Sequence, residues 1–442
     1  MYNKIIRLSL PLILVNISVP LSGLISTMLM GHLESVKFLT ATVIGISILN
    51  FITYISAFLR MSTTGVISQY RSHNDWESIL IWIIRSIIFC FVIASIILLF
   101  NRSIFELITS IFNVSSNVSP ILYSYYRVVI FSIFFIFINH IYCGYFIALQ
   151  KTIFVLLMAV LSNSLNILLG IVLVLYFHLD IIGIAVSFLV GQVAITIVFS
   201  FFVISTMKYY LKDSRKFFFS INNLTNIREY YLFFCVNRDL LIRSILLLIS
   251  LNSFYLFSSH LGNNVVAANG LLLEFSYLLT MVLDSIANIT ESLIGNNISN
   301  YDSVKILRIL NTTKNLTIII TIFMTLVYSV TYPYILQILT SLEVVQKTAN
   351  NYVIYSILFP LFAAYSFWID GVYIGLLKTQ IMRNSMFIAS LCYFVLVLLL
   401  WRFGNSGLWI SFLLFFILRS LTLYFPIRLF LKTGILVKTR AS

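Results

Sequence analysis

Twelve apolar segments follow one another along the chain. Each is long enough to cross a bilayer, which takes about 20 helical residues. Lipid offers no partner to backbone N–H and C=O groups, so segments of this length must be helices. The segments span, with approximate ends, residues 8–30, 41–67, 79–100, 121–148, 153–177, 181–206, 240–260, 265–295, 310–335, 351–377, 384–402 and 407–430. The sequence therefore predicts an all-α membrane protein with twelve transmembrane helices.

The composition supports this class and excludes two others. Of the 442 residues, 60% are hydrophobic and 10% are charged, whereas soluble domains carry about 25% charged residues. The net charge of +14 would suit nucleic acid, but Lys and Arg stand just beyond the apolar segments, as topology signals and lipid contacts do. The first segment is longer than the apolar part of a signal peptide. We therefore expect membrane lipids, and no nucleic acid, as partners.

The distribution of Lys and Arg predicts the orientation. Most of them fall on the side that holds both termini and the basic stretch 208–236, and the other side holds only four. These four are Lys37, Arg102, Lys347 and Arg402. Because cytoplasmic loops are enriched in Lys and Arg, we expect a multi-pass protein of the cytoplasmic (inner) membrane with both termini in the cytoplasm.

A short sequence echo predicts two related halves. Residues 144–152 read GYFIALQKT, and residues 371–379, half the chain later, read GVYIGLLKT, with agreement at five of nine positions. The echo predicts two pseudo-symmetric six-helix lobes in parallel orientation, residues 1–207 and 237–442, joined by a basic cytoplasmic linker at 208–236. A cleft between two such bundles is a natural place for a substrate.

Acidic residues inside the segments are candidates for binding a coupling cation, because charge at membrane depth is costly and usually functional. The candidates are Asp370, Asp284, Glu274 and Glu291. The spacing of the last three places them on roughly one helix face. Asp370 could bind and release a proton as water access alternates; the alternative is a structural hydrogen bond. Glu291 lies near a segment end, and its alternative is a merely solvated carboxylate.

Other polar residues are candidates for the substrate cavity: Arg60, Asn139, Asn163, Asn166, Ser26 and Asn288. Laying Phe51 over Phe275 aligns Arg60 with Asp284, so these opposite charges could pair across the cleft. The alternatives for Arg60 are a local ion pair, or a side chain that snorkels to the membrane interface. Asn288 shares the helix stripe of Asp284. The other asparagines could bind substrate or join helices. Pro11 and Pro20 predict a kink in the first helix.

The sequence gives no sign of an enzyme or of a cofactor. It contains no nucleotide-binding loop, zinc-protease motif or nucleophile elbow. The four cysteines form no CxxC pair, so we predict no metal site. The only expected non-protein participant is a coupling ion, H⁺ or Na⁺.

Several longer stretches resemble the multidrug and toxic compound extrusion (MATE) transporters, and among them the branch of DNA-damage-inducible protein F. They keep their order over nearly the full length. The matching stretches are residues 10–20, 31–33, 59–65, 237–239, 267–269, 370–375 and 382–386. The resemblance implies two six-helix lobes in a V-shaped, monomeric transporter that exports amphipathic or cationic small molecules in exchange for protons or sodium ions.

The chain also departs from that branch. Members carry aspartates where this chain has Ser26 and Gly170, and an asparagine where it has Glu274. The resemblance therefore places any cation coupling in the C-terminal lobe, at Asp370 first and Asp284 second. Two alternatives stay open: a flippase for lipid-linked precursors, and a degenerate member that binds without coupled transport.

Overall fold

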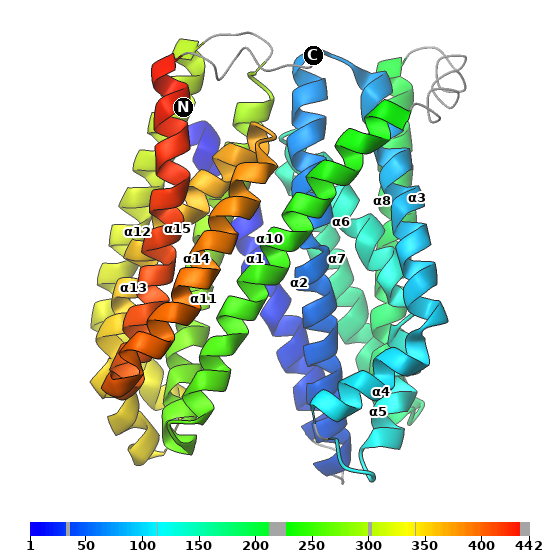
Figure 1. Ribbon diagram of the computed structural model, residues 1–442. Coiled ribbons are helices and arrows are strands. Elements are labelled where there is room, and N and C mark those ends of the chain that lie inside the picture. Colours follow the sequence, from blue (N-terminus) through cyan, green and yellow to red (C-terminus); the bar gives the residue numbers. More distant parts are fainter. Residues whose placement is uncertain (32–35, 113, 212–226, 299–302, 341, 434–442) are drawn as a thin grey trace. The chain divides into compact units, whose positions relative to one another are not determined.

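The computed structural model describes the chain except for residues 32–35, 113, 212–226, 299–302, 341 and 434–442. Among the described residues the regular elements are all helices, as predicted (Figure 1). They are α1 (Tyr2–Gly31), α2 (Val36–Ser72), α3 (Trp76–Leu99), α4 (Asn101–Ile111), α5 (Ser119–Val129), α6 (Ser132–Ala148), α7 (Thr152–Ile171), α8 (Asp180–Leu211), α10 (Ile227–Ser259), α11 (Asn263–Gly295), α12 (Ser303–Leu339), α13 (Glu343–Gly375), α14 (Thr379–Leu400) and α15 (Gly404–Thr433).

Helix lengths fit a bilayer. Nine helical stretches of the described residues are long and apolar enough to span it, or ten if the bent pair α5 and α6 counts as one span. One of the nine, Thr379–Arg428, contains both α14 and α15. The predicted spans at 384–402 and 407–430 therefore correspond to separate helices, and the predicted span at 8–30 corresponds to α1.

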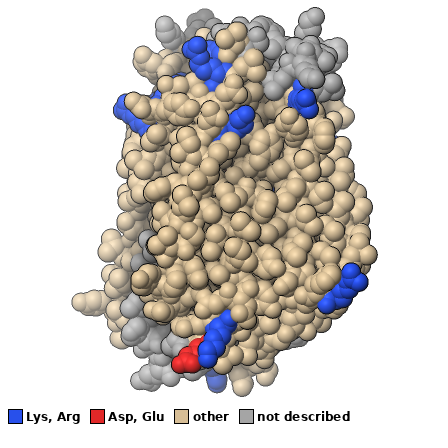
Figure 2. Space-filling view, turned by 90° about the vertical axis from the view of Figure 1, so that its left-hand side faces the viewer, with Lys and Arg blue, Asp and Glu red and all other residues tan. Residues whose placement is uncertain are grey.

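The outer surface is that of a membrane protein. Along α12, Ile319, Phe323, Leu326 and Val330 are all exposed, an arrangement that water would penalise and lipid acyl chains would not. Figure 2 shows a face whose middle carries no visible charged side chain, with Lys and Arg gathered toward its two ends. The chain is thus a multi-pass membrane protein.

Two details differ from the predicted spans. The span at 121–148 is two helices, α5 and α6, which meet at an angle of 48°. At the break the Ser132 hydroxyl donates to the Val129 carbonyl at 2.6 Å. The short helix α4 was not predicted; it is held by Phe105, which is buried against the rings of Tyr123 and Tyr126. Pro11 and Pro20 both lie within the single helix α1, so their predicted kink produces no break.

The chain divides into two compact units. The N-terminal unit comprises Leu14–Tyr231, and the C-terminal unit comprises Leu232–Ser442 together with Met1–Ile13. The predicted linker at 208–236 is partly helical, because α8 continues to Leu211 and α10 begins at Ile227. Its residues 212–226 lie outside the described part of the chain. Within the C-terminal unit, α13 packs against α11, α12 and α15 (Figure 1).

The echo that opens at Gly144 and Gly371 is a repeated turn. Gln150 and Leu377 both take left-handed backbone conformations, with φ of 58° and 55°. After each of them a lysine N–H closes the turn on a carbonyl five residues earlier, at 2.9 Å from Lys151 and 3.0 Å from Lys378. The two halves therefore share this local fold in the register that the echo predicts.

The glycines of the echo fix how helices pack in each unit. A Cβ on Gly144 would lie 2.6 Å from the Arg60 carbonyl oxygen, and a Cβ on Gly371 would lie 2.2 Å from that of Ala287. Small residues allow such backbone contact between membrane helices. This register pairs Arg60 with Ala287, so the alignment that laid Arg60 over Asp284 is wrong by almost one helical turn.

Candidate functional site

A buried charge centre lies inside the C-terminal unit. Asp370 on α13 is 6% exposed, and its Oδ2 accepts hydrogen bonds from Arg243 on α10 and from Arg419 on α15. Both arginines are buried as well. Removing three charges from water costs several kcal/mol per ion unless they are paired and hydrogen-bonded. The carboxylate thus ties three helices together, and two positive charges share one negative charge.

Asp284 on α11 extends this centre. Its carboxylate attracts the Arg419 guanidinium, and its Oδ2 accepts a long hydrogen bond of 3.5 Å from Asn288 Nδ2. Asp284 is half-buried and Asn288 is buried. With Asp284 the centre contains two arginines and two aspartates, so its charges balance. We call these four side chains, Arg243, Asp284, Asp370 and Arg419, the charge centre.

The other two acidic candidates lie on α11, about two to three helical turns before and after Asp284. Glu274 is exposed, and it stands ten residues before Asp284 on α11, a rise of roughly 15 Å. Glu291 is fully buried, at 0% exposure, so the alternative of a solvated carboxylate is wrong. The structure therefore does not gather the four predicted acids into one site. It brings Asp284 near Asp370 through Arg419.

Asn139 joins helices in the N-terminal unit. Its Nδ2 on α6 donates to the Gln192 side-chain oxygen on α8 at 2.8 Å. Thr196, also on α8, donates to Asn139 Oδ1 at 3.0 Å. Both ends of the amide are therefore bonded to α8, as expected for a polar contact that holds membrane helices together.

Asn163 and Asn166 on α7 act in a similar way. Asn163 Nδ2 lies 3.3 Å from the Ser18 carbonyl on α1, and Ser187 on α8 donates to Asn166 Oδ1 at 2.9 Å. Of the two alternatives for these asparagines, helix joining has direct contacts in its favour. The Ser26 side chain lies outside the described residues, and Gly170 is buried on α7.

Arg60 lies near Cys143, the residue of the N-terminal half that is equivalent to Asp370. It interacts electrostatically with Cys143 and His140 on α6. Cys143 directly precedes Gly144, just as Asp370 directly precedes Gly371, so the two occupy equivalent places in the repeat. The N-terminal unit therefore has a cation near this position and no carboxylate on it.

Sequence reasoning missed the two arginines that hold Asp370. Arg243 and Arg419 stand near segment ends or among polar neighbours, which hid their depth. A usable signal existed, because a buried carboxylate needs a cation nearby, and both arginines lie in apolar segments of the same half. Among the described residues, no group of His, Cys, Asp and Glu could hold a metal ion.

A bundle of long apolar helices that repeats one turn in both halves, with paired charges at membrane depth, is the architecture of a secondary transporter. The sequence pattern of the MatE family matches residues 11–172 and again residues 240–400. The chain belongs to the MatE family of transporters and is not an enzyme.

The comparisons agree over nearly the whole chain. The DNA damage-inducible protein F of Escherichia coli is 26% identical over 417 residues, which cover 94% of this chain and 90% of that protein. A MATE transporter of Vibrio cholerae has the same fold, with a TM-score of 0.84 and 17% identity, over 99% of this chain and 98% of the other. A MOP superfamily transporter of Pyrococcus furiosus gives a TM-score of 0.85 and 16% identity, over 99% and 97% of the two chains.

Proposed function

We propose that this chain is a secondary active exporter that moves amphipathic or cationic small molecules out of the cell in exchange for protons or sodium ions. The observation that carries the proposal is the buried Asp370 held by Arg243 and Arg419. A transporter with paired charges at membrane depth has the means to exchange one cation for another there.

The coupling follows from competition for one carboxylate. While both arginines bind Asp370, neither a proton, a sodium ion nor a cationic substrate can bind it. Once the ion pair opens, these cations compete for the same oxygens, so binding of one disfavours binding of the other. If each prefers a different conformation, their fluxes are linked, because both bias one conformational equilibrium.

The proposal includes the setting of the protein. Its lobes are residues 1–207 and 237–442, with a cytoplasmic linker at 208–236. It works as a monomer in the cytoplasmic (inner) membrane with both termini in the cytoplasm, and its partners are the small amphipathic substrate and membrane lipids. The charge centre takes no cofactor beyond H⁺ or Na⁺.

A second candidate function is transport of an anionic amphiphile, such as a lipid-linked precursor. Arg419 Nη1 is buried and has no hydrogen-bond acceptor among the described residues, so it can donate to an anionic group. The MOP superfamily transporter of Pyrococcus furiosus is described by a reversed polarity of its binding pocket that suggests a different function. This candidate predicts a substrate of the opposite charge.

Transport by the purified protein in proteoliposomes tests both candidates. We expect an imposed proton or sodium gradient to drive export of an amphipathic cation such as ethidium. Adding ethidium should in turn dissipate either the proton gradient or the sodium gradient, and pH-sensitive and sodium-sensitive dyes report which of the two falls. Translocation of a fluorescent anionic lipid without ethidium transport would favour the second candidate. Movement of neither compound would identify a non-coupled binding protein.

A further inference from the structure

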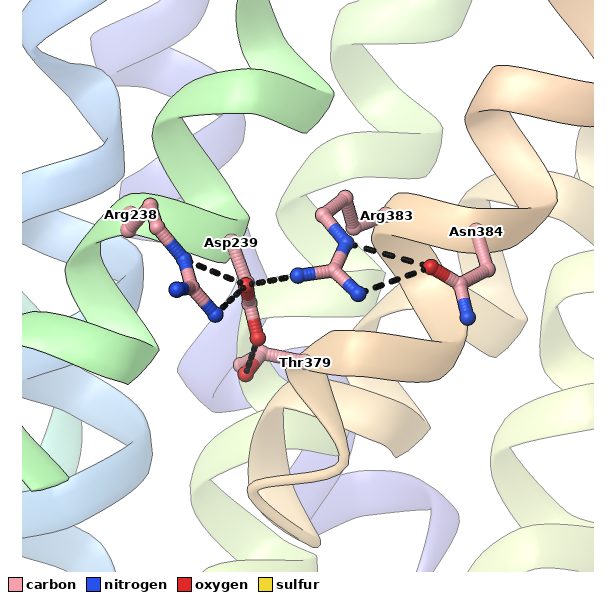
Figure 3. Close-up of polar contacts among 5 residues, drawn as sticks. All are labelled: Arg238, Asp239, Thr379, Arg383 and Asn384. Atoms are coloured by element: carbon pink, nitrogen blue, oxygen red, sulfur yellow. Dashed lines mark hydrogen bonds and ion pairs between the residues drawn. The ribbon is translucent and has the colours of Figure 1, made fainter.

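A second buried carboxylate paired with arginines, Asp239, lies on α10, one turn before Arg243. Asp239 is completely buried, and its carboxylate contacts Arg238 on the same helix and Thr379 and Arg383 on α14 (Figure 3). We call these four residues the Asp239 cluster. Its residues lie in stretches that the sequence singled out, but none of them is a candidate for cation coupling or for the substrate cavity, and the proposed transport function does not use them.

Both oxygens of Asp239 are occupied. Oδ1 accepts from Arg383 Nη1 at 2.7 Å and from Arg238 Nη2 at 3.1 Å. Oδ2 accepts from the Thr379 hydroxyl at 3.3 Å. Thr379 is the first residue of α14, where the helix dipole favours a negative charge. Asp239 therefore connects α10 to the first two turns of α14.

The remaining nitrogens of Arg383 are also held. Its Nε and Nη2 both donate to Asn384 Oδ1, at 3.1 and 3.0 Å (Figure 3). Because the guanidinium is planar, these two bonds fix the direction in which Nη1 points. Nη1 is then aimed at Asp239, so the bond between the helices does not depend on a freely rotating side chain.

The Asp239 cluster and the charge centre hold α10 at two neighbouring points. Asp239 and Arg243 are four residues apart and lie on one face of α10. Their partners are also near each other in sequence: Asp370 lies near the end of α13, and Thr379, nine residues later, begins α14 after the tight turn at Leu377. One hairpin, α13 with α14, thus binds α10 twice.

The N-terminal half lacks the charged residues that make these contacts. In the register of the echo, Asp239 corresponds to Leu12 and Arg383 to Leu156. Asp370 likewise corresponds to Cys143. The two anchoring points therefore occur together in the half that contains the paired carboxylate, and both are replaced in the other half.

We propose that Asp239 and Arg383 are positioning residues for the charge centre: they fix α10 against the α13–α14 hairpin at the height where Arg243 reaches Asp370. The expected effect of these two residues on transport rests on the proposed function. Its structural part, the dependence of the Arg243–Asp370 pair on the Asp239–Arg383 bond, holds whatever the protein carries.

Transport kinetics test the functional part. Replacing Arg383 with Gln is expected to lower the maximal rate of coupled export by about tenfold, within the range found for changes in packed networks, with little change in the substrate KM. Arg383→Lys should restore part of the rate, because its amine can bind Asp239 but lacks the two bonds to Asn384 that orient the guanidinium. Arg238→Gln is the matched control: it removes a charge from the same carboxylate, but its bond to Asp239 lies within α10, so its rate should stay near wild type. Equal losses in Arg238→Gln and Arg383→Gln, or no rescue by lysine, would overturn the proposal.

Thermal unfolding in detergent tests the structural part without any transport. If the Asp239–Arg383 bond positions Arg243, the effects of Arg383→Gln and Arg243→Gln on the unfolding midpoint should not add in the double variant. Those of Arg238→Gln and Arg243→Gln should add. Additivity in both pairs would refute the positioning role, even with transport fully active. Non-additivity in the first pair alone, in a protein that shows no coupled transport, would retain it and reject only the proposed function.

Discussion

Replacing Asp370 with Asn is expected to abolish substrate-dependent movement of protons and sodium ions in proteoliposomes. An amide cannot carry the negative charge for which the arginines and the transported cations compete. Arg243 and Arg419 would face each other without their shared carboxylate. Asp180→Asn is the matched control, since it removes an acid from the N-terminal unit at a left-handed residue, φ 45°, a conformation that Asn tolerates. If the coupled flux of Asp370→Asn equals that of the wild type, Asp370 does not couple ion movement to substrate movement.

Loss of folding could imitate loss of coupling, and a second variant separates the two. Breaking a buried ion pair by removing one partner costs about 3–5 kcal/mol, whereas replacing the whole set by apolar side chains is often neutral. The quadruple variant Arg243→Met, Asp284→Leu, Asp370→Leu, Arg419→Met replaces the whole charge centre and should therefore unfold near the wild-type temperature while its coupled flux is absent. A folded quadruple variant that still couples ion and substrate movement would show that the charge centre is not the coupling site.

Gly371→Ala is expected to lower the stability markedly. The added Cβ would lie 2.2 Å from the Ala287 carbonyl oxygen, and a backbone atom in a packed helix cannot turn aside as a flexible side chain can. Overpacking of this kind costs about 1–3 kcal/mol or more. The unfolding midpoint in detergent should fall clearly, and α13 should carry the neighbouring Asp370 away from its partners.

Gly270→Ala provides the control for this prediction. Gly270 lies inside α11, just as Gly371 lies inside α13, but a Cβ on Gly270 would meet only the Tyr255 ring, at 3.9 Å. Alanine favours a helix over glycine by about 0.5–1 kcal/mol, so this variant should be as stable as wild type or slightly more so. Equal midpoints for Gly371→Ala and Gly270→Ala would show that α11 and α13 are not in the close contact described.

The parts of the structure that depend on averages over many residues could be predicted from the sequence. Apolar length predicted the helical spans, and five shared residues predicted two related halves, which share the turn at Gln150 and Leu377. Hydropathy could not show the break at Ile130, because the bent pair α5 and α6 is apolar on both sides of it. It also missed α4, whose apolar face is too short to count as a span.

The candidate site was less predictable, because it depends on helices far apart in sequence. Asp370 was correctly placed at depth, but its partners lie 127 and 49 residues away. Nothing in the periodicity of α10 or α15 says which helix each will meet. The polar pattern likewise could not tell whether Asn139 binds a substrate or another helix. In the structure, Asn139 binds Gln192 and Thr196 of the neighbouring helix α8.

The repeated packing of Gly144 and Gly371 has an evolutionary consequence. Two copies of one backbone frame allow charge to be lost from one copy or gained in the other by single substitutions, without a new fold. Cys143 occupies the place of Asp370 and already has Arg60 within electrostatic reach. One amino-acid substitution, from cysteine to aspartate, would give this half an acid near the Arg60 cation. The repeated backbone arrangement thus leaves, at Cys143, a second position that could accommodate a carboxylate.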